Sequence, residues 1–234
     1  EEGIVDLISY MDHTPGQGQF KSFDAYRRYQ QEVYGQSAEQ SHRLVEQKMQ
    51  AAETAGGRIR ALSERALAHM IPLASHDDDS AEKVGGMADA GVKISEFPVN
   101  LPAAAAARER GMVTVFGAPN VVRGTSQSGS VNAADAIKAG VATCLCSDYT
   151  PGALLSAVFR LHDDLGWDLP RAVAVATRNP AEMTGLSDRG QIAEGKRADL
   201  IWVTRSQGLP IVRGVWRNGD RKSTRLNSSH RYVS

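Results

Sequence analysis

The sequence predicts an α/β protein, the later part of a (β/α)8 TIM barrel followed by a small β appendage. Five short apolar runs of β type end in polar residues, and a stretch with helical features follows each run. After Gly190 the chain changes to turns and short strands. The chain has 234 residues in total, whereas an intact barrel alone needs about 250. We therefore expect that the first barrel strands precede Glu1.

Strands and helices are placed by composition and by the residues at their ends. Apolar β-type runs mark the strands, whereas capping residues and glycines bound the helices. The expected strands are Gly3 to Met11, Ile71 to Ser75, Val92 to Phe97, Met112 to Gly117 and Val141 to Cys146. The expected helices are Phe20 to Gly35, Ser37 to Gly57, Arg58 to Met70, Asp79 to Gly91, Asn100 to Gly111, Asn132 to Gly140, Pro151 to Asp164, Trp167 to Thr177 and Asn179 to Gly185.

Several helix starts are expected from capping chemistry. Ser37 and Gln40 have the spacing of a capping box, and Asp79 stands at the same spacing before a glutamate. Asn100 opens an alanine-rich helix. Thr150 stands before a proline, which suits the first turn of a helix, so we expect Thr150 as a cap.

The C-terminal part is expected to differ from the barrel. Short strands are expected at Leu200 to Val203 and Ile211 to Trp216, with a turn at Asn218-Gly219. From residue 221 the sequence is polar and has no apolar period, so we expect a disordered or non-native tail. The expected domains are 1–186 for the barrel, 187–220 for the β appendage and 221–234 for the tail.

Charge and cysteine content limit the class of partner and the compartment. Lysine plus arginine and aspartate plus glutamate each number 27. With neither sign in excess, we expect no nucleic acid and no anionic membrane as partner. We find neither a run of about 18 apolar residues nor a basic-then-apolar leader. Cys144 and Cys146 lie two apart in one expected strand, where a mutual disulfide is strained, so reduced thiols and a cytoplasmic protein are expected.

Asp148 is the first candidate for a catalytic residue. It follows the apolar run that begins at Val141 and stops at Ser147. Because side chains alternate along a strand, Asp148 should share a face with Cys144 and Cys146. In barrels and open α/β sheets the chemistry gathers at the carboxyl ends of the strands.

Polar residues also follow other strands. His76 precedes three aspartates, and an imidazole beside a carboxylate suits a metal, although an ordinary surface histidine fits the same pattern. His13, before Thr-Pro-Gly, is compatible with a ligand or with a loop-shaping role. Glu96 is compatible with a ligand, a substrate contact or a helix-facing charge. For Cys144 and Cys146 we favour packing over metal binding.

A glycine- and serine-rich loop with one cation follows the fourth expected strand. Backbone amides of such a loop can line an anion, and Arg123 can pair with a phosphate. An ordinary surface cation is the alternative for Arg123. The candidate phosphate-binding residues are Asn120, Arg123, Gly124, Ser126, Gln127 and Ser128.

Several motifs resemble the amidohydrolase superfamily. The run NPAEMTGL…DRGQIAEGKRADLIWV, from Asn179 to Val203, resembles the end of its barrels, where the chain completes a small β-sandwich. The stretches MDHTPGQ, ASHDDD, EFPVN, GAPNVVRG and SDYTPGALL resemble one branch of the superfamily, the diphosphatases of phosphonate degradation. The resemblance covers Gly3 to Gly219, and Gln127 stands where that branch tends to have histidine.

The resemblance implies a metal-dependent hydrolase. It implies one or two zinc, manganese or iron ions held by His13, His76, Glu96 and Asp148, with Asp148 accepting a proton from the attacking water. The implied substrate is a ribose triphosphate that loses diphosphate. The expected partner is thus a phosphorylated small molecule, and homo-oligomer formation is left open.

Two rival functions remain at this point. An amidohydrolase that cleaves a C–N bond in a cyclic amide, N-acyl group or amine would use the same aspartate and metal, without needing the Arg/Gly/Ser loop. An inactive barrel fragment that only binds partners is the other rival, because paired metal ligands of a first strand are missing.

Overall fold

A computed structural model describes residues 5–12, 14–18, 20, 22–124 and 131–224. The chain divides into two compact units, Glu1–Pro151 and Gly152–Ser234. Each unit is described by itself. Among the described residues, no helix combines the length and the apolar character that crossing a membrane requires.

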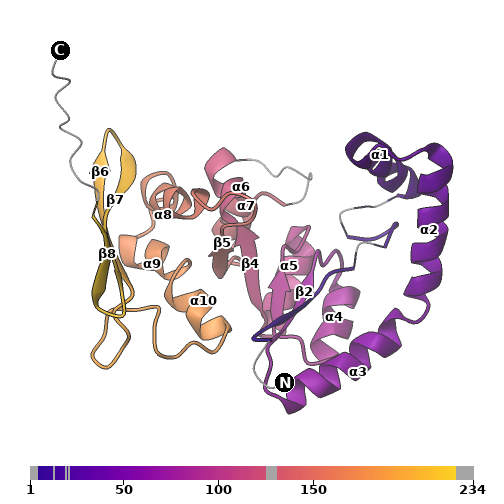
Figure 1. Ribbon diagram of the computed structural model, residues 1–234, viewed down its shortest axis with the longest axis horizontal. Coiled ribbons are helices and arrows are strands. Elements are labelled where there is room, and N and C mark those ends of the chain that lie inside the picture. The colour runs from indigo at the N-terminus through magenta and orange to yellow at the C-terminus, as the bar shows by residue number, and fades with distance from the viewer. Residues whose placement is uncertain (1–4, 13, 19, 21, 125–130, 225–234) are drawn as a thin grey trace. The chain divides into compact units, whose positions relative to one another are not determined.

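A five-stranded parallel sheet organises the first unit. Its strands are β1 (Ile8–Tyr10), β2 (Leu73–His76), β3 (Ile94–Glu96), β4 (Val113–Gly117) and β5 (Cys144–Cys146), and neighbours in sequence are neighbours in the sheet. All four pairings are parallel. Figure 1 labels β2, β4 and β5 of this sheet, and the strand order is that of consecutive βα units in a barrel. The α/β fold and the five strands expected from the sequence are confirmed.

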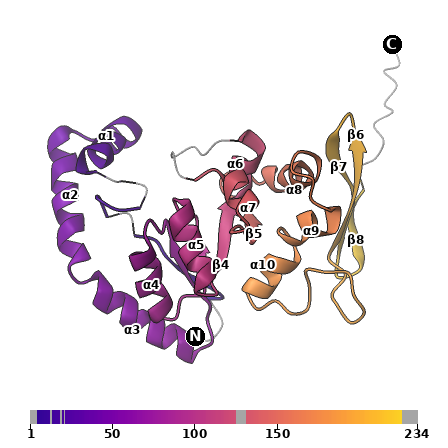
Figure 2. The same cartoon turned by 180° about the vertical axis from the view of Figure 1, so that it is seen from behind.

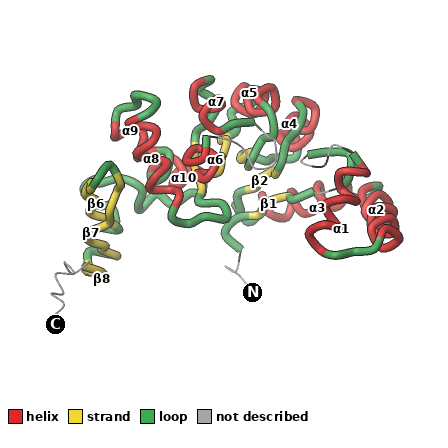
Figure 3. Tube along the Cα trace, turned by 90° about the horizontal axis from the view of Figure 1, so that it is seen from above, coloured by secondary structure: helices red, strands yellow, loops and turns green. Residues whose placement is uncertain are grey.

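Helices cover the face of the sheet that carries the larger apolar side chains. These helices include α3 (Ala55–Ala68), α4 (Ala81–Asp89) and α5 (Leu101–Glu109), and Figure 3 shows α4 and α5 on one side of the strands. Tyr10 from β1 also bonds through its hydroxyl to Ser63 of α3, at 2.8 Å. The buried cluster on this face consists of Tyr10, Ala66, Leu73, Val84, Val92, Ala103, Ala107 and Met112.

A helical hairpin lies between β1 and α3 in the sequence. It consists of α1 (Phe23–Tyr34) and α2 (Ala38–Ala52), which Figure 2 shows at one end of this unit. The predicted capping box is confirmed: Ser37 accepts from the Gln40 backbone N–H, and the Gln40 side chain accepts from the Ser37 N–H.

Two predicted helix caps are wrong, and the reason is local hydrogen bonding. Helix α4 is capped by Ser80, whose hydroxyl accepts the Lys83 N–H, because the Asp79 carboxylate accepts the Gly18 N–H instead. The Thr150 N–H donates to the Ser147 carbonyl in a turn, and the next helix begins only at residue 153.

The expected loop after β4 begins as a helix. Helix α6 (Ala118–Arg123) has a proline in its first turn and ends at Gly124, whose φ of +74° closes it. Helix α7 (Ala133–Lys138) is capped by Asn132, the residue at which the expected helix begins. Residues 125–130 between them lie outside the described part of the chain.

The second unit combines three helices with an antiparallel sheet. The helices are α8 (Ala153–Asp163), α9 (Leu169–Ala174) and α10 (Arg178–Met183), and the sheet contains β6 (Leu200–Ser206), β7 (Leu209–Arg217) and β8 (Asp220–Thr224). Arg205 of β6 donates from Nη1 and Nη2 to the two carboxylate oxygens of Asp163 of α8, at 3.0 and 2.5 Å. The predicted Asn218-Gly219 turn joins β7 to β8. Strand β8 ends at Thr224, so the antiparallel ladder includes the first four residues of the expected tail.

Candidate active site

The register of the parallel sheet collects the predicted site residues at its carboxyl edge. His76 ends β2 and is paired with Glu96, which ends β3. Glu96 is paired with Val115, which is in turn paired with Cys144. Since partners in register point to the same face, the His76 and Glu96 side chains share the face opposite the buried cluster. Two of the predicted strand-end residues are thus neighbours in space.

His76 is held by aromatic and acidic neighbours. Its Nδ1 lies 3.3 Å from Asp77 Oδ2, and the Phe97 ring stands edge-on with centroids 5.3 Å apart. Burial lowers the pKa of His76, but the hydrogen bond with Asp77 and the charges of Asp77 and Glu96 outweigh it, so the pKa is raised. A carboxylate at Nδ1 leaves Nε2 as the ring nitrogen that can bind a metal.

Glu96 is tied to the first strand. Its Oε2 accepts a hydrogen bond from Ser9 Oγ of β1, at 2.9 Å. Ser9 lies on the same face because its register partner, Ala74, stands two residues before His76. Of the alternatives for Glu96, a helix-facing charge is therefore wrong, since the helices α3 to α5 cover the other face.

Asp148 lies two residues beyond β5, next to the end of β4. Its Oδ1 accepts the Tyr149 N–H at 2.9 Å, and its side chain is exposed. A Cβ placed on Gly117 would lie 2.7 Å from Asp148 Oδ2, so the carboxylate lies directly against the glycine that ends β4. Asp148 is therefore at the same edge as His76 and Glu96, as the sequence predicts.

The backbone turns through the left-handed region at three of these strand ends. Asp77 follows His76 with φ +53°, Phe97 follows Glu96 with φ +54°, and Asp148 has φ +50°. Aspartate tolerates this conformation, whereas a bulky residue such as phenylalanine rarely adopts it. Strained residues of this kind cluster at functional sites, which supports a functional role for this edge.

Asp12, which sequence reasoning left aside, organises the loop after β1. Its Oδ1 accepts from the Thr14 N–H at 2.9 Å and the Thr14 hydroxyl at 2.6 Å, and its Oδ2 accepts from Gln17 at 2.7 Å. Burial raises the pKa of the Asp12 carboxyl, but the bonds from Thr14 and Gln17 leave that pKa below its ordinary value. His13 lies outside the described residues and stays a predicted ligand.

Sequence reasoning also missed Lys83, which binds the end of β2. Its Nζ donates to the carbonyls of His76 and Asp77, at 3.0 and 3.1 Å, and lies 3.9 Å from Asp78 Oδ1. Lys83 stands three residues after the N-cap Ser80. A cation in the first turn opposes the helix macrodipole, and this unfavourable placement is the signal that could have found it.

Asp78 joins β2 to β3 from a fully buried position. Its Oδ2 accepts from the Ser75 hydroxyl at 2.6 Å and from the Ser95 hydroxyl at 2.5 Å. Ser75 and Ser95 are paired in register and have no exposed surface. Asp78 therefore fixes the two strands that carry His76 and Glu96, while Asp77 is the carboxylate that contacts the imidazole.

We expect Asp78→Ala to lower the free energy of unfolding by about 3 to 5 kcal/mol, the usual effect of removing one partner from a buried charge pair. The Ser95 hydroxyl would lose the Asp78 acceptor, the Ser75 hydroxyl would keep only the Ile94 carbonyl at 3.4 Å, and Lys83 would lose a carboxylate 3.9 Å from its Nζ. Urea denaturation measures the change. Asp89→Ala is the matched control, because Asp89 is exposed and its 3.4 Å pair with Arg110 should contribute less than about 1 kcal/mol. Equal effects of the two substitutions would contradict this role.

Three of the predicted phosphate-binding residues belong to α6 and its C-terminal end. Asn120 Oδ1 accepts from Arg123 Nη2 at 3.3 Å, and Gly124 follows as the helix end. The Arg123 guanidinium also lies 5.5 Å from the centroid of the Tyr149 ring. Since Tyr149 follows Asp148, the cation lies beside the loop that carries the catalytic candidate. Ser126, Gln127 and Ser128 lie outside the described residues and stay predictions.

The donor types at this edge suit a transition metal, although the ligand set is incomplete. Imidazole and carboxylate are the usual ligands of zinc, manganese and iron. Within the described ranges, no three His, Cys, Asp or Glu side chains lie close enough to hold an ion together. Cys144 is buried and Cys146 is half-buried. Burial raises the pKa of the Cys146 thiol to about 11.

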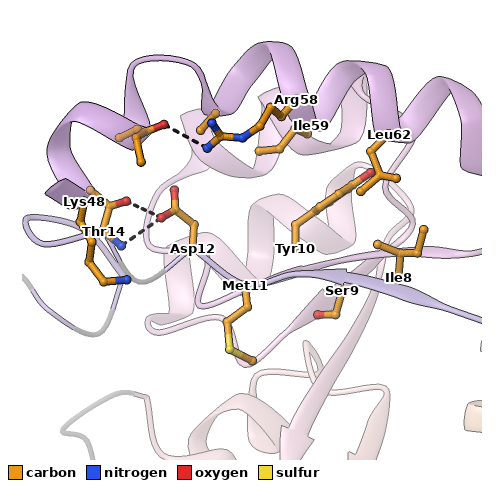
Figure 4. A pocket seen from close by; sticks show the side chains of 13 residues that line it. Ile8, Ser9, Tyr10, Met11, Asp12, Thr14, Lys48, Arg58, Ile59 and Leu62 are labelled. Carbon is orange, nitrogen blue, oxygen red and sulfur yellow. Dashed lines mark hydrogen bonds between the residues drawn. The ribbon is translucent and has the colours of Figure 1, made fainter.

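A separate open cavity of about 470 Å³ borders β1. Figure 4 shows Arg58, Ile59 and Leu62 of α3 facing Ile8 and Tyr10 across it. Of the predicted catalytic and phosphate-binding residues that the structure describes, none lines this cavity. We therefore locate the candidate active site at the carboxyl edge of the sheet.

Comparisons with known proteins agree with the fold. The model of the amidohydrolase family matches residues 32–228. Over 220 residues, the chain is 41% identical to alpha-D-ribose 1-methylphosphonate 5-triphosphate diphosphatase of Escherichia coli strain K12, which covers 93% of this chain. The chain spans 58% of the length of that relative.

Solved structures show the same fold at low sequence identity. An amidohydrolase from Thermotoga maritima MSB8 has a TM-score of 0.53 and 17% identity, covering 87% of this chain and 56% of its own. An adenosine deaminase from Xanthomonas campestris with bound zinc has a TM-score of 0.52 and 16% identity, covering 72% and 49%. Together with the family match over most of its length, the parallel sheet and its polar carboxyl edge establish that this chain belongs to the amidohydrolase family.

Proposed function

We propose that the protein containing this chain hydrolyses alpha-D-ribose 1-methylphosphonate 5-triphosphate to the 5-phosphate and diphosphate, as a step of phosphonate catabolism. The observation that carries the proposal is the position of Arg123, beside Tyr149 and hence beside Asp148. A cation next to the catalytic candidate suits an anionic substrate. The identity of 41% to a diphosphatase of this name supports the particular substrate.

His76 and Glu96, with Asp148 and His13, are the residues that would hold a divalent zinc, manganese or iron ion. When bound, such an ion lowers the pKa of a coordinated water and offsets charge on the phosphates. Asp77 would keep the His76 ring oriented through its contact at Nδ1, and Ser9 would orient Glu96. Lys83 and Asp78 would hold the strand ends that carry both side chains.

Asp148 is the proposed general base. As water attacks phosphorus, its oxygen forms a new P–O bond, the anhydride P–O bond breaks, and diphosphate leaves with the bonding electrons. The water proton goes to the Asp148 carboxylate, whose Oδ1 is already fixed by the Tyr149 N–H. Proton transfer to a positioned carboxylate contributes about 10²- to 10⁴-fold to the rate.

Arg123 is the proposed contact to the phosphate oxygens. Arg123→Ala should lower kcat/KM for the ribose triphosphate about 10- to 100-fold, because hydrogen bonds to charged groups are worth about 1.5 to 3 kcal/mol. The loss should shrink with an uncharged amide or ester probe, which presents no anionic oxygens. Arg65→Ala is the matched control, since Arg65 is an exposed arginine of α3 away from the strand ends, and it should leave both values unchanged.

Phosphorus NMR of the products tests the bond that is cleaved. Diphosphate and orthophosphate give different resonances, and diphosphate should appear first. Orthophosphate as the first product would refute the diphosphatase assignment. Unchanged kcat/KM with both substrate types in Arg123→Ala, or turnover of amides alone, would favour a hydrolase of C–N bonds, which would use Asp148 without needing Arg123.

A further inference from the structure

The backbone conformation of Gly117, at the end of β4, does not require glycine. Its φ of −73° and ψ of 125° are open to any residue. Gly124, seven residues later, is the opposite case, because its φ of +74° favours glycine and nothing would meet an added Cβ there within 4 Å. At Gly117 the argument for glycine is therefore steric: it concerns the atoms that a Cβ would meet.

The space at Gly117 is taken by the Asp148 carboxylate. A Cβ on Gly117 would lie 2.7 Å from Asp148 Oδ2 and 3.5 Å from its Cβ and Cγ. The other oxygen, Oδ1, is fixed by the Tyr149 N–H at 2.9 Å. The carboxylate is thus bounded on one side by the backbone of its own loop and on the other by the bare end of β4.

We propose that Gly117 is a positioning residue for Asp148: its missing side chain lets the carboxylate lie against the end of β4, where it can meet the attacking water. This inference rests on the role proposed for Asp148 in hydrolysis. A methyl group at position 117 can be accommodated at low energetic cost, because the atom it would clash with, Asp148 Oδ2, is the end of a side chain. Rotation of the Asp148 carboxylate relieves the contact without moving β4.

Gly117→Ala should therefore affect turnover much more than stability. We expect kcat to fall about 10- to 100-fold, since a displacement of about 1 Å of a reacting group can cost about 100-fold. KM should change less than about threefold and Tm should stay within a few degrees, as the substrate contacts of Arg123 and the sheet are untouched. Gly86→Ala is the matched control, because Gly86 is an exposed helical glycine with no atom within 4 Å of an added Cβ.

Introducing Gly117→Ala into an Asp148→Gly protein tests whether the loss of kcat depends on the Asp148 carboxylate. In an Asp148→Gly protein, the added methyl has no carboxylate to displace, so Gly117→Ala should leave the residual turnover unchanged. An unaltered kcat in the single variant, or an equal loss in both backgrounds, would overturn the proposal. If Gly117→Ala alone does not fold, recovery of folded protein by Asp148→Gly supports it and lack of recovery refutes it.

Assays of the wild type distinguish failure of the proposed function from failure of the role proposed for Gly117. The wild type is assayed first with the ribose triphosphate and then with an amide probe. Turnover of the amide alone removes the proposed substrate, and the same comparison of kcat values is then made with the amide. A loss through Asp148 would be seen with either substrate, because the position of the base does not depend on the leaving group.

Discussion

Asp148→Asn is expected to lower kcat by about 10²- to 10⁴-fold in active protein that contains this chain, the range for losing a general base. The fold should persist for two reasons. Asparagine tolerates the left-handed conformation that Asp148 adopts, and its Oδ1 can still accept the Tyr149 N–H. Steady-state kinetics measures the loss, while circular dichroism and elemental analysis report fold and bound metal.

The matched control for this substitution is Asp135→Asn. Asp135 is an exposed aspartate in the first turn of α7, in the same unit as Asp148. It should keep kcat within about twofold, because exposed substitutions of this kind act only through small local effects. Wild-type turnover in Asp148→Asn would remove Asp148 from the mechanism.

Chelation of the metal is expected to abolish activity, and added zinc, manganese or iron should restore it. His76→Ala should in addition lower the amount of bound metal, because the ring is the nitrogen ligand proposed within the described residues. Loss of one ligand or of its support commonly costs about 10- to 100-fold in metal affinity or more. Elemental analysis of dialysed protein provides the measurement independently of any assay of turnover.

His69→Ala serves as the control for His76. His69 is the exposed residue at the C-terminal end of α3, and its replacement should leave metal content and activity unchanged. Full metal occupancy in His76→Ala would rule out His76 as a ligand. Activity that survives chelation would argue against the metal-dependent mechanism as a whole.

Much of the fold was predictable because local signals and the global pattern agree. The starts of α2 and α5 follow from the side chains of Ser37 and Asn100, and each of these caps is confirmed. The strand ends at His76 and Glu96 were predicted to within one residue, since short apolar runs stop where the sheet meets polar solvent. Parallel pairing then brings both residues to the same edge without further information.

The rest depended on contacts that no local pattern contains. Asp79 and Ser80 are both good caps, and the choice between them is made by Gly18, which is distant in sequence. The space shared by Gly117 and Asp148 likewise exists only once β4 and β5 are neighbours. The sequence alone identifies Lys83 only as a surface charge, because its partners are the backbone carbonyls at the end of β2, which no local pattern indicates.

The left-handed residues at the strand ends have an evolutionary consequence. The left-handed backbone costs about 1 to 2 kcal/mol at Phe97, whereas aspartate tolerates it at positions 77 and 148. The cost should be highest at Phe97, the bulkiest of the three. A substitution that relieved this strain at Phe97 would also remove the ring that stands edge-on to His76, so stability and the geometry of the site are opposed at this position. Laboratory evolution of this protein should accordingly select for turnover and stability together.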